Sequence, residues 1–233
     1  MSERNVFVRE PPELFTLAAK WIRGVVNTAL NQGGGSIALA GGNTPRPVYE
    51  LLAAPPLRDQ IDWTNLDVYW GDERAVPPTD PQSNYAMAWD ALLSRVPIPP
   101  SQVHRMEAEH ADREAAARDY EAILPRALDV LVLGVGPDGH TASIFPGSDA
   151  MRESHRRVMP VIGPKPPPAR LTITPPVIET AHEIVVIATG ADKAAVVART
   201  LDGSNSARDL PIQFARRGAW FLDPAAASML RGS

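Results

Sequence analysis

The residue with the clearest capacity for chemistry is a histidine at the end of a glycine-rich turn. His140 closes the segment GVGPDGH, residues 134–140, which follows a short apolar run. Histidine is the side chain whose ordinary titration falls near neutral pH, and Asp138 lies two residues before it. A carboxylate there could orient the imidazole or raise its basicity, which is the minimum for general base catalysis. A structural histidine that caps the turn is the alternative, and the neighbouring aspartate and glycines favour the functional one.

The same segment matches the G-x-G-x-x-G pattern of dinucleotide-binding turns, so a nicotinamide cofactor has to be considered. Three features disfavour it. Pro137 lies inside the turn, and the helix that should follow meets Pro146 and Gly147 within two turns. No acidic residue ends a second strand at the expected distance, since Glu153 lies in a polar stretch. The sequence therefore predicts no nicotinamide cofactor.

A second turn has the composition of a phosphate-binding loop. The segment GGNTP, residues 41–45, follows the apolar run 37–40. Thr44 is predicted to cap a helix whose first residue is Pro45. Glycines let backbone N–H groups approach a ligand, and a helix N-terminus favours an anion. A phosphate cradle and an unliganded strand-to-helix turn fit this pattern equally well, and no Gly-Lys-Ser/Thr follows to make it a Walker A loop.

Charged residues stand beside other apolar runs. The segment GDER, residues 71–74, comes after an aromatic run, where its charges could line a cleft or simply solvate a loop. Arg170 opens a later apolar run, and Lys193 lies at the start of a predicted helix. These two cations, together with Arg46 and Arg74, could clamp a phosphate from neighbouring strand ends. Each of them alone is also typical of an ordinary surface charge.

Several other catalytic classes lack their signatures. The chain has no cysteine, which excludes thiolate catalysis, disulfides and Cys-ligated zinc. The remaining histidines, at 104, 110, 155 and 182, show no metal-binding spacing, and no G-x-S-x-G elbow occurs. Ser143 lies near His140, but nothing in the spacing supports it as a nucleophile. If the chain is a hydrolase, direct attack by water is the simplest mechanism.

The elements that must position these residues alternate along the chain. Apolar runs predict strands at 37–40, 66–70, 129–133, 170–174, 184–188 and 219–222, and helical periodicity marks 12–31, 83–95, 110–124 and 192–201, with a shorter helix at 175–182. This alternation predicts a three-layer α/β/α fold, with a mainly parallel, Rossmann-like sheet covered on both faces, in a single domain over 1–233. Ligands of such sheets bind at the carboxyl ends of the strands, where the motifs stand. The proline-rich segment 163–168 is predicted to be a mobile loop or lid.

Composition limits the partners that the chain can have. It has 233 residues, of which 44% are hydrophobic, and a net charge of −4. This balance argues against nucleic acid or an anionic membrane as the main partner, and favours a small molecule. The first residues contain no apolar core of a secretory signal, and no run approaches the roughly 20 apolar residues of a membrane span. We therefore expect a cytoplasmic protein, either a monomer or a small homo-oligomer.

Longer segments, taken together, resemble the 6-phosphogluconolactonase family. The matching segments are ALAGGNTPRPVYELL at 38–52, IDW at 61–63, YWGDERAVPPTDPQSNYAMAWDALL at 69–93, LDVLVLGVGPDGHTASIFPGS at 128–148, PPPARLTIT at 166–174, ATGADKAAVV at 188–197 and WFLDPAAA at 220–227. They occur in the order of the family and span nearly the whole chain. The combination of GDER, SNY and GPDGHTASIFP is far more specific than any single glycine motif.

The resemblance implies an α/β/α domain related to sugar-phosphate isomerases and deaminases. It implies hydrolysis of 6-phospho-D-glucono-1,5-lactone to 6-phosphogluconate in the oxidative pentose phosphate pathway, with no cofactor and no essential metal. Residue by residue, it implies that His140 is the general base and that Asp138 orients it. It implies that the 6-phosphate is held by the loop residues Gly42, Asn43 and Thr44 and by the positive charges of Arg74 and Lys193, with help from Arg170. Asp72 and Asn84 would line the sugar side of the pocket. Backbone N–H groups around Gly139 and His140 are candidates for stabilising the oxyanion.

Two alternatives stay open at this point. An amino-sugar phosphate deaminase/isomerase shares the GG-x-TP loop and the DGH turn, but its pattern has a glutamate five residues after the histidine. Phe145 stands at that position here, which favours the lactonase. A non-catalytic sugar-phosphate sensor would keep Thr44, Arg74 and Lys193 and could lose the histidine. The presence of His140, and the lack of a visible DNA-binding segment, disfavour the sensor.

Overall fold

Two β-sheets form the framework of the protein. The computed structural model describes residues 5–203 and 209–231. Its main sheet has six parallel strands in the order β1-β9-β8-β5-β2-β3. They are β1 (Val6–Val8), β2 (Gly35–Leu39), β3 (Leu66–Trp70), β5 (Val130–Leu133), β8 (Glu183–Ala188) and β9 (Ala219–Leu222). A second, antiparallel sheet joins β4 (Asp72–Arg74), β7 (Ala169–Ile173) and β6 (Val158–Ile162) in that order.

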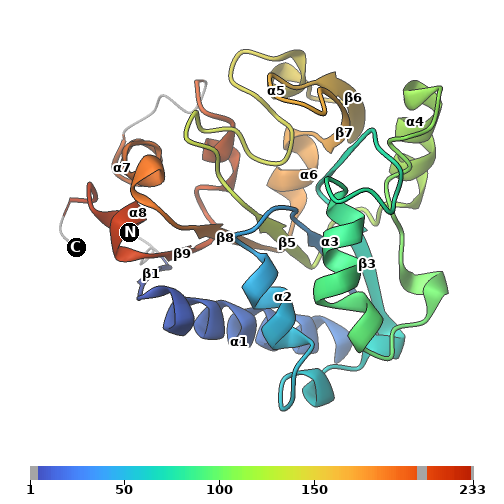
Figure 1. Ribbon diagram of the computed structural model, residues 1–233, viewed down its shortest axis with the longest axis horizontal. Helices are drawn as coiled ribbons and strands as arrows, with labels where there is room; N and C mark the ends of the chain where they lie inside the picture. The colour runs from blue at the N-terminus through green and yellow to red at the C-terminus, as the bar shows by residue number, and fades with distance from the viewer. Residues whose placement is uncertain (1–4, 204–208, 232–233) are drawn as a thin grey trace.

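Helices cover both faces of the main sheet, which confirms the predicted three-layer, mainly parallel α/β fold (Figure 1). On one face lie α1 (Pro11–Leu30), α2 (Arg46–Leu52) and α3 (Asn84–Ala91), and on the other α6 (Pro175–Thr180) and α7 (Ala194–Asp202). The helix α4 (Arg113–Ile123) packs beside β6. Two short helices, α5 (Asp149–Arg152) and α8 (Pro224–Ala227), complete the set. Single 3₁₀ turns lie at Arg58–Gln60, Trp63–Asn65, Leu93–Arg95, Pro100–Gln102, Ala191–Lys193 and Pro211–Ala215. No helix in the described part is long and apolar enough to cross a membrane.

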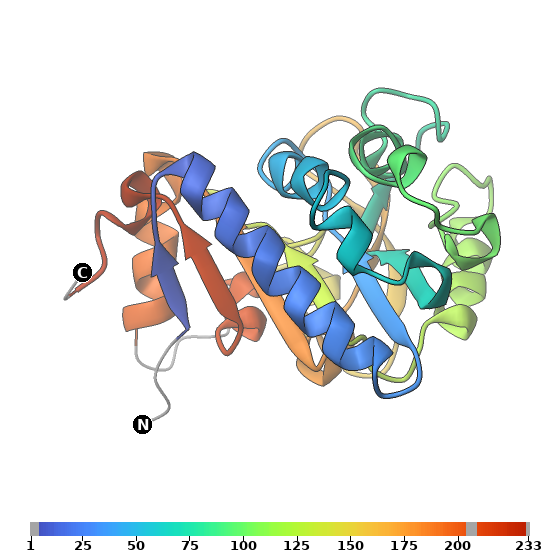
Figure 2. The ribbon, with the colours of Figure 1, turned by 90° about the horizontal axis from the view of Figure 1, so that it is seen from below.

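Periodicity explains how α1 lies across the sheet (Figure 2). Its residues Leu14, Ala18, Ile22 and Val26 recur every four positions, and each is at most 1% exposed. This spacing places them on one face of a helix, which packs on the strands. Two prolines begin α1, where the first-turn N–H groups need no intrahelical acceptor.

The central strands show why the ligand site lies where it does. All four residues of β5 are buried, as expected for a parallel strand covered on both faces. Strand β5 pairs with β2 on one side and β8 on the other. From β2 the chain continues to β3 at the sheet edge, while β5 leads towards β8 on the other side. A crevice forms where neighbouring connections diverge in this way, at the carboxyl ends of β2 and β5.

Two buried tyrosines hold the strand ends at this crevice. The hydroxyl of Tyr49 donates to the carbonyl of Ala40 and accepts from its N–H, both at 2.9 Å. The hydroxyl of Tyr120 does the same for Trp70, at 3.2 and 2.7 Å. Burial raises the pKa of both phenols, so both hydroxyls remain donors at neutral pH. The residues just before the two turns GGNTP and GDER are therefore fixed.

The structure corrects several expectations about local structure. The GDER segment is not a loop: its residues 72–74 form β4. The predicted strand at 170–174 exists as β7, but it pairs with β4 and β6 outside the main sheet. Thr44 does not cap a helix, because α2 begins at Arg46 with Pro45 as its N-cap. The segment 163–168 is a loop that connects β6 to β7 as a hairpin, closed by a 2.6 Å bond from the Gly163 N–H to the Pro168 carbonyl. Its predicted mobility stays a prediction. Strands β1 and β6 were missed.

Candidate active site

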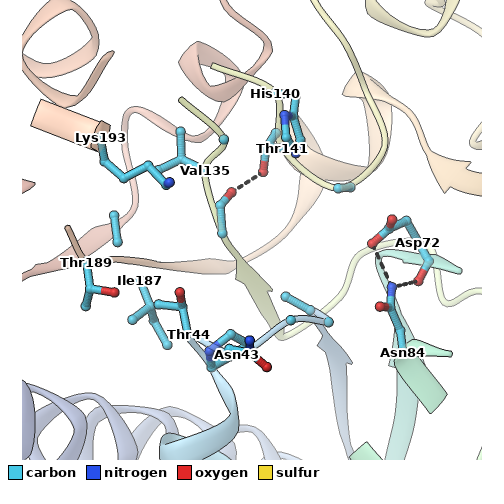
Figure 3. Close-up of a pocket in the computed structure, with 18 of the residues that line it drawn as sticks. Asn43, Thr44, Asp72, Asn84, Val135, His140, Thr141, Ile187, Thr189 and Lys193 are labelled. Atoms are coloured by element: carbon cyan, nitrogen blue, oxygen red, sulfur yellow. Dashed lines mark hydrogen bonds between the residues drawn. The ribbon is translucent and has the colours of Figure 1, made fainter. Parts of the chain in front are cut away.

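A pocket of about 170 Å³ opens at the carboxyl ends of β2, β3, β5 and β8. Nine of the ten residues predicted for the site line it: Gly42, Asn43, Thr44, Asp72, Arg74, Asn84, His140, Arg170 and Lys193. The tenth, Asp138, lies against His140. In Figure 3, Lys193, Thr189 and Thr44 lie on one side of the pocket, and Asp72 and Asn84 on the other. The structure thus brings together residues separated by up to 151 positions in the chain, from 42 to 193.

The imidazole of His140 is held at one edge by Asp138. Its Nδ1 lies 2.6 Å from Asp138 Oδ1, which also accepts the His140 backbone N–H at 3.2 Å. Burial favours a raised pKa for Asp138, but the hydrogen bond and charge interaction with His140 outweigh it and lower that pKa. An ionised carboxylate only accepts hydrogen bonds, so Nδ1 carries the proton. The neutral ring then keeps its lone pair on Nε2, which has no hydrogen-bond partner elsewhere in the described chain.

Gly136 provides the space for this pair. A Cβ at this position would lie 2.1 Å from His140 Nδ1 and 2.6 Å from Asp138 Oδ1. Any side chain there would displace the imidazole. The backbone closes the same turn, because the Gly136 N–H donates to the His140 carbonyl at 2.8 Å. The middle glycine of the pattern that resembles a dinucleotide-binding turn therefore has a different physical cause here, which is the close approach of an imidazole.

The opposite wall is a network of buried polar groups around Asp72. Asn84 Nδ2 donates to the Asp72 carbonyl at 2.7 Å and to its Oδ1 at 3.1 Å (Figure 3). Ser143 Oγ donates to Asp72 Oδ2 at 2.5 Å. Ser143 is fully buried, so its hydroxyl is part of this scaffold, which agrees with its rejection as a nucleophile. Gly41 makes room for Asn84, since a Cβ there would lie 1.8 Å from Asn84 Oδ1.

Glu73 is a structural anchor that sequence reasoning missed. This carboxylate is 3% exposed and accepts four hydrogen bonds, from the N–H groups of Arg74, Asn84 and Tyr85 at 2.7–2.8 Å and from Ser83 Oγ at 2.9 Å. Burial raises the pKa of Glu73, and the hydrogen bonds oppose that rise. The carboxylate therefore ties the GDER strand to the start of α3. The sequence signal for this contact was the presence of both GDER and SNY among the segments that resemble the family.

Cations approach the pocket from three elements. Arg74 uses Nη1 to bind the Gln82 carbonyl at 2.8 Å, while its buried Nε has no hydrogen-bond partner among the described residues. Lys193 points into the pocket and pairs with Asp192 (Figure 3). Arg170 is buried, and this burial lowers its pKa. Arg46 lies elsewhere: it pairs with Glu50 and Asp90 and does not line the pocket.

Backbone N–H groups divide into free and occupied sets. Those of Gly42, Asn43 and Thr44 donate to no other described residue, so the GGNTP turn presents three unused donors beside the pocket. Those of Gly139 and His140 already donate to the Gly136 carbonyl and to Asp138. These two N–H groups are therefore engaged within the turn, and the stabilisation of an oxyanion by backbone N–H groups around them stays a prediction. Sequence reasoning also missed Val135, Thr141, Ile187 and Thr189 as lining residues. Val135, Thr141 and Thr189 lie within quoted motifs but were not singled out, and Ile187 lies in a predicted strand.

The fold and the pocket define a class of protein: a doubly wound α/β protein that binds a small polar ligand at its topological switch point. Cations and free N–H groups give the pocket the chemistry of an anion-binding site. Within 5–203 and 209–231, no group of three His, Asp or Glu side chains is placed to hold a metal ion.

The family model described as glucosamine-6-phosphate isomerases/6-phosphogluconolactonase matches residues 9–222, and the chain belongs to this family. It is 43% identical to the 6-phosphogluconolactonase of Streptomyces coelicolor, over 91% of this chain and 88% of the relative. It is 36% identical to that of Synechocystis sp., over 89% of each chain. The 6-phosphogluconolactonase structure from Trypanosoma brucei superposes with a TM-score of 0.85 at 31% identity, covering 98% of this chain and 99% of the other. These relatives are hydrolases.

We expect Glu73→Ala to destabilise the protein by about 2–4 kcal/mol, because two buried and two partly buried donors lose their acceptor. The measurement is the free energy of unfolding in urea. Glu179→Ala is the matched control, since Glu179 is exposed and its loss should change stability by less than about 0.5 kcal/mol. Equal effects of the two substitutions would show that Glu73 does not anchor α3.

Proposed function

We propose that this chain hydrolyses 6-phospho-D-glucono-1,5-lactone to 6-phosphogluconate, the lactonase step of the oxidative pentose phosphate pathway. The observation that carries the proposal is the His140–Asp138 pair, set in a pocket that also holds Lys193 and the free N–H groups of the GGNTP turn. The names of the relatives above support the same reaction. A base beside an anion-binding pocket fits a substrate that has a phosphate at one end and an electrophilic carbonyl at the other.

In this proposal the 6-phosphate binds on the side of the pocket formed by Lys193 and the GGNTP turn. Gly42, Asn43 and Thr44 offer backbone donors, and Lys193 offers a positive charge within reach of the same space. Hydrogen bonds that involve charged partners are the strong ones, so this arrangement is suited to hold a dianion. Arg74, with its unpaired Nε, and Arg170 add positive potential from the second sheet.

His140 acts as the general base towards water. Its Nε2 removes a proton as the water oxygen forms a bond to the lactone carbonyl carbon. The carbonyl π electrons move to oxygen, and the tetrahedral intermediate collapses by breaking the bond to the ring oxygen. The imidazolium returns its proton to that oxygen, which leaves as a hydroxyl. Asp138 keeps Nδ1 protonated throughout and stabilises the transient positive charge.

The sugar hydroxyls face the wall formed by Asp72 and Asn84. Asp72 is fixed by Asn84 and Ser143, so its carboxylate offers acceptors in a set orientation. A rigid acceptor can discriminate among hydroxyl arrangements, because only a hydroxyl that meets a remaining lone pair of the carboxylate can donate to it. This wall is therefore the proposed determinant of sugar orientation relative to His140.

We expect His140→Ala to lower kcat for lactone hydrolysis by about 10²–10⁴-fold, with little change in substrate binding. The assay must be corrected for spontaneous ring opening. His155→Ala is the matched control, because His155 is exposed and does not line the pocket. Retention of kcat in His140→Ala would remove His140 from the chemistry. Ammonia release from glucosamine 6-phosphate by the wild type, at a comparable rate, would favour the deaminase alternative instead.

Removal of the Lys193 charge tests the phosphate side separately. Lys193→Met should raise KM and the inhibition constant of 6-phosphogluconate by about 10- to 100-fold, because a charge-assisted contact is lost. The effect on kcat should be much smaller. Lys20→Met, an exposed position on α1, serves as the control. An unchanged KM in Lys193→Met would place the phosphate elsewhere in the pocket.

A further inference from the structure

Phe145 contacts both His140 and Arg170. Its ring centroid lies 5.0 Å from that of the His140 imidazole, with the two planes tilted by 43°. The Arg170 guanidinium carbon lies 5.6 Å from the same ring centroid. Phe145 is 8% exposed and does not line the pocket. We infer that Phe145 is a positioning residue for the hydrolysis, which acts by fixing the imidazole of His140. This inference rests on the proposed function.

A second contact is needed because Asp138 holds the imidazole only at Nδ1. A single hydrogen bond at one edge leaves the ring free to tilt about that bond, which would swing Nε2 across the pocket. The Phe145 ring blocks this tilt from one side. Together, the hydrogen bond and the ring contact define one orientation of Nε2, and catalytic rates are sensitive to displacements of about 1 Å.

Residues of the β6–β7 hairpin and Arg170 pack against Phe145 and support it. Arg170 donates from Nε to the Pro167 carbonyl at 3.0 Å and from Nη2 to the Lys165 carbonyl at 3.2 Å. Gly163 packs so closely that a Cβ there would lie 3.1 Å from both Arg170 Nε and the Phe145 ring. The segment 163–168 is therefore bound by its own carbonyls to the guanidinium that supports Phe145. Through Arg170 and Phe145, this segment supports the position of His140.

An aromatic side chain suits this position for an electrostatic reason. His140 becomes an imidazolium during the proposed reaction, and Arg170 is a permanent cation over the Phe145 ring. The π-system of an aromatic ring attracts a nearby cation, so Phe145 can contact both groups, whereas direct contact between the two cations would be repulsive. An aliphatic residue of similar size would contact both groups but would not provide this attraction.

The first test is a double-mutant cycle on lactone hydrolysis. Phe145→Leu should lower kcat about 10- to 100-fold with KM within twofold, and should have no effect on the residual rate in a His140→Ala background. Phe221→Leu is the matched control, because Phe221 is fully buried against Phe7 and Trp21 and does not line the pocket. The same fold-loss from Phe145→Leu in both backgrounds, or an equal loss from Phe221→Leu, would overturn the inference.

The second test does not depend on activity. The imidazole ¹⁵N shifts report the tautomer, and the His140 signals are assigned by their absence from His140→Ala. We expect Phe145→Leu to shift and broaden the His140 nitrogen signals, because the ring samples several tilts about its bond to Asp138, with His104 unchanged as an internal reference. Unchanged His140 nitrogen shifts would overturn the inference. Inactivity of the wild type towards the lactone would instead contradict the proposed function, and this readout would still decide the role of Phe145.

Discussion

The hydrogen bond between His140 Nδ1 and Asp138 is the interaction on which the rest of the site depends. It decides which nitrogen carries the proton and therefore which nitrogen can act as a base. The surrounding residues make this hydrogen bond possible. Strand β5 ends where the turn must begin, Gly136 leaves the volume that the imidazole occupies, and the ring of Phe145 contacts the imidazole. A side chain at position 136 would displace the imidazole and disrupt its hydrogen bond with Asp138.

The other wall of the pocket follows from a different constraint, that buried charges must be satisfied. Asp72 and Glu73 are both buried in adjacent positions, and alternation along β4 points them to different partners. Asp72 is bound by Asn84 and Ser143, and Glu73 by the first residues of α3. Three segments that are distant in the sequence are therefore mutually dependent, and a change in any of them would leave a buried carboxylate short of donors.

Much of the fold and the site was predictable from the sequence, for identifiable reasons. Continuous apolar runs marked β5 and β8, and four-residue spacing marked α1, because burial imposes those periods. The parallel order of the main sheet then placed the motif residues at one edge. The small sheet escaped prediction, because β4 is three residues long and charged, and β6 contains a proline. Phe145 and Glu73 act through tertiary contacts, which no local pattern reveals.

The central claim is that Asp138 fixes the tautomer in which Nε2 of His140 is the base, and Asp138→Asn tests it most directly. An amide offers its NH₂ as well as its oxygen to Nδ1, so the tautomer is no longer imposed while the size of the side chain is kept. The measurement is kcat for lactone hydrolysis, corrected for spontaneous opening. We expect kcat to fall by about 10²–10⁴-fold in a fully folded variant. A kcat within twofold of the wild type would contradict it.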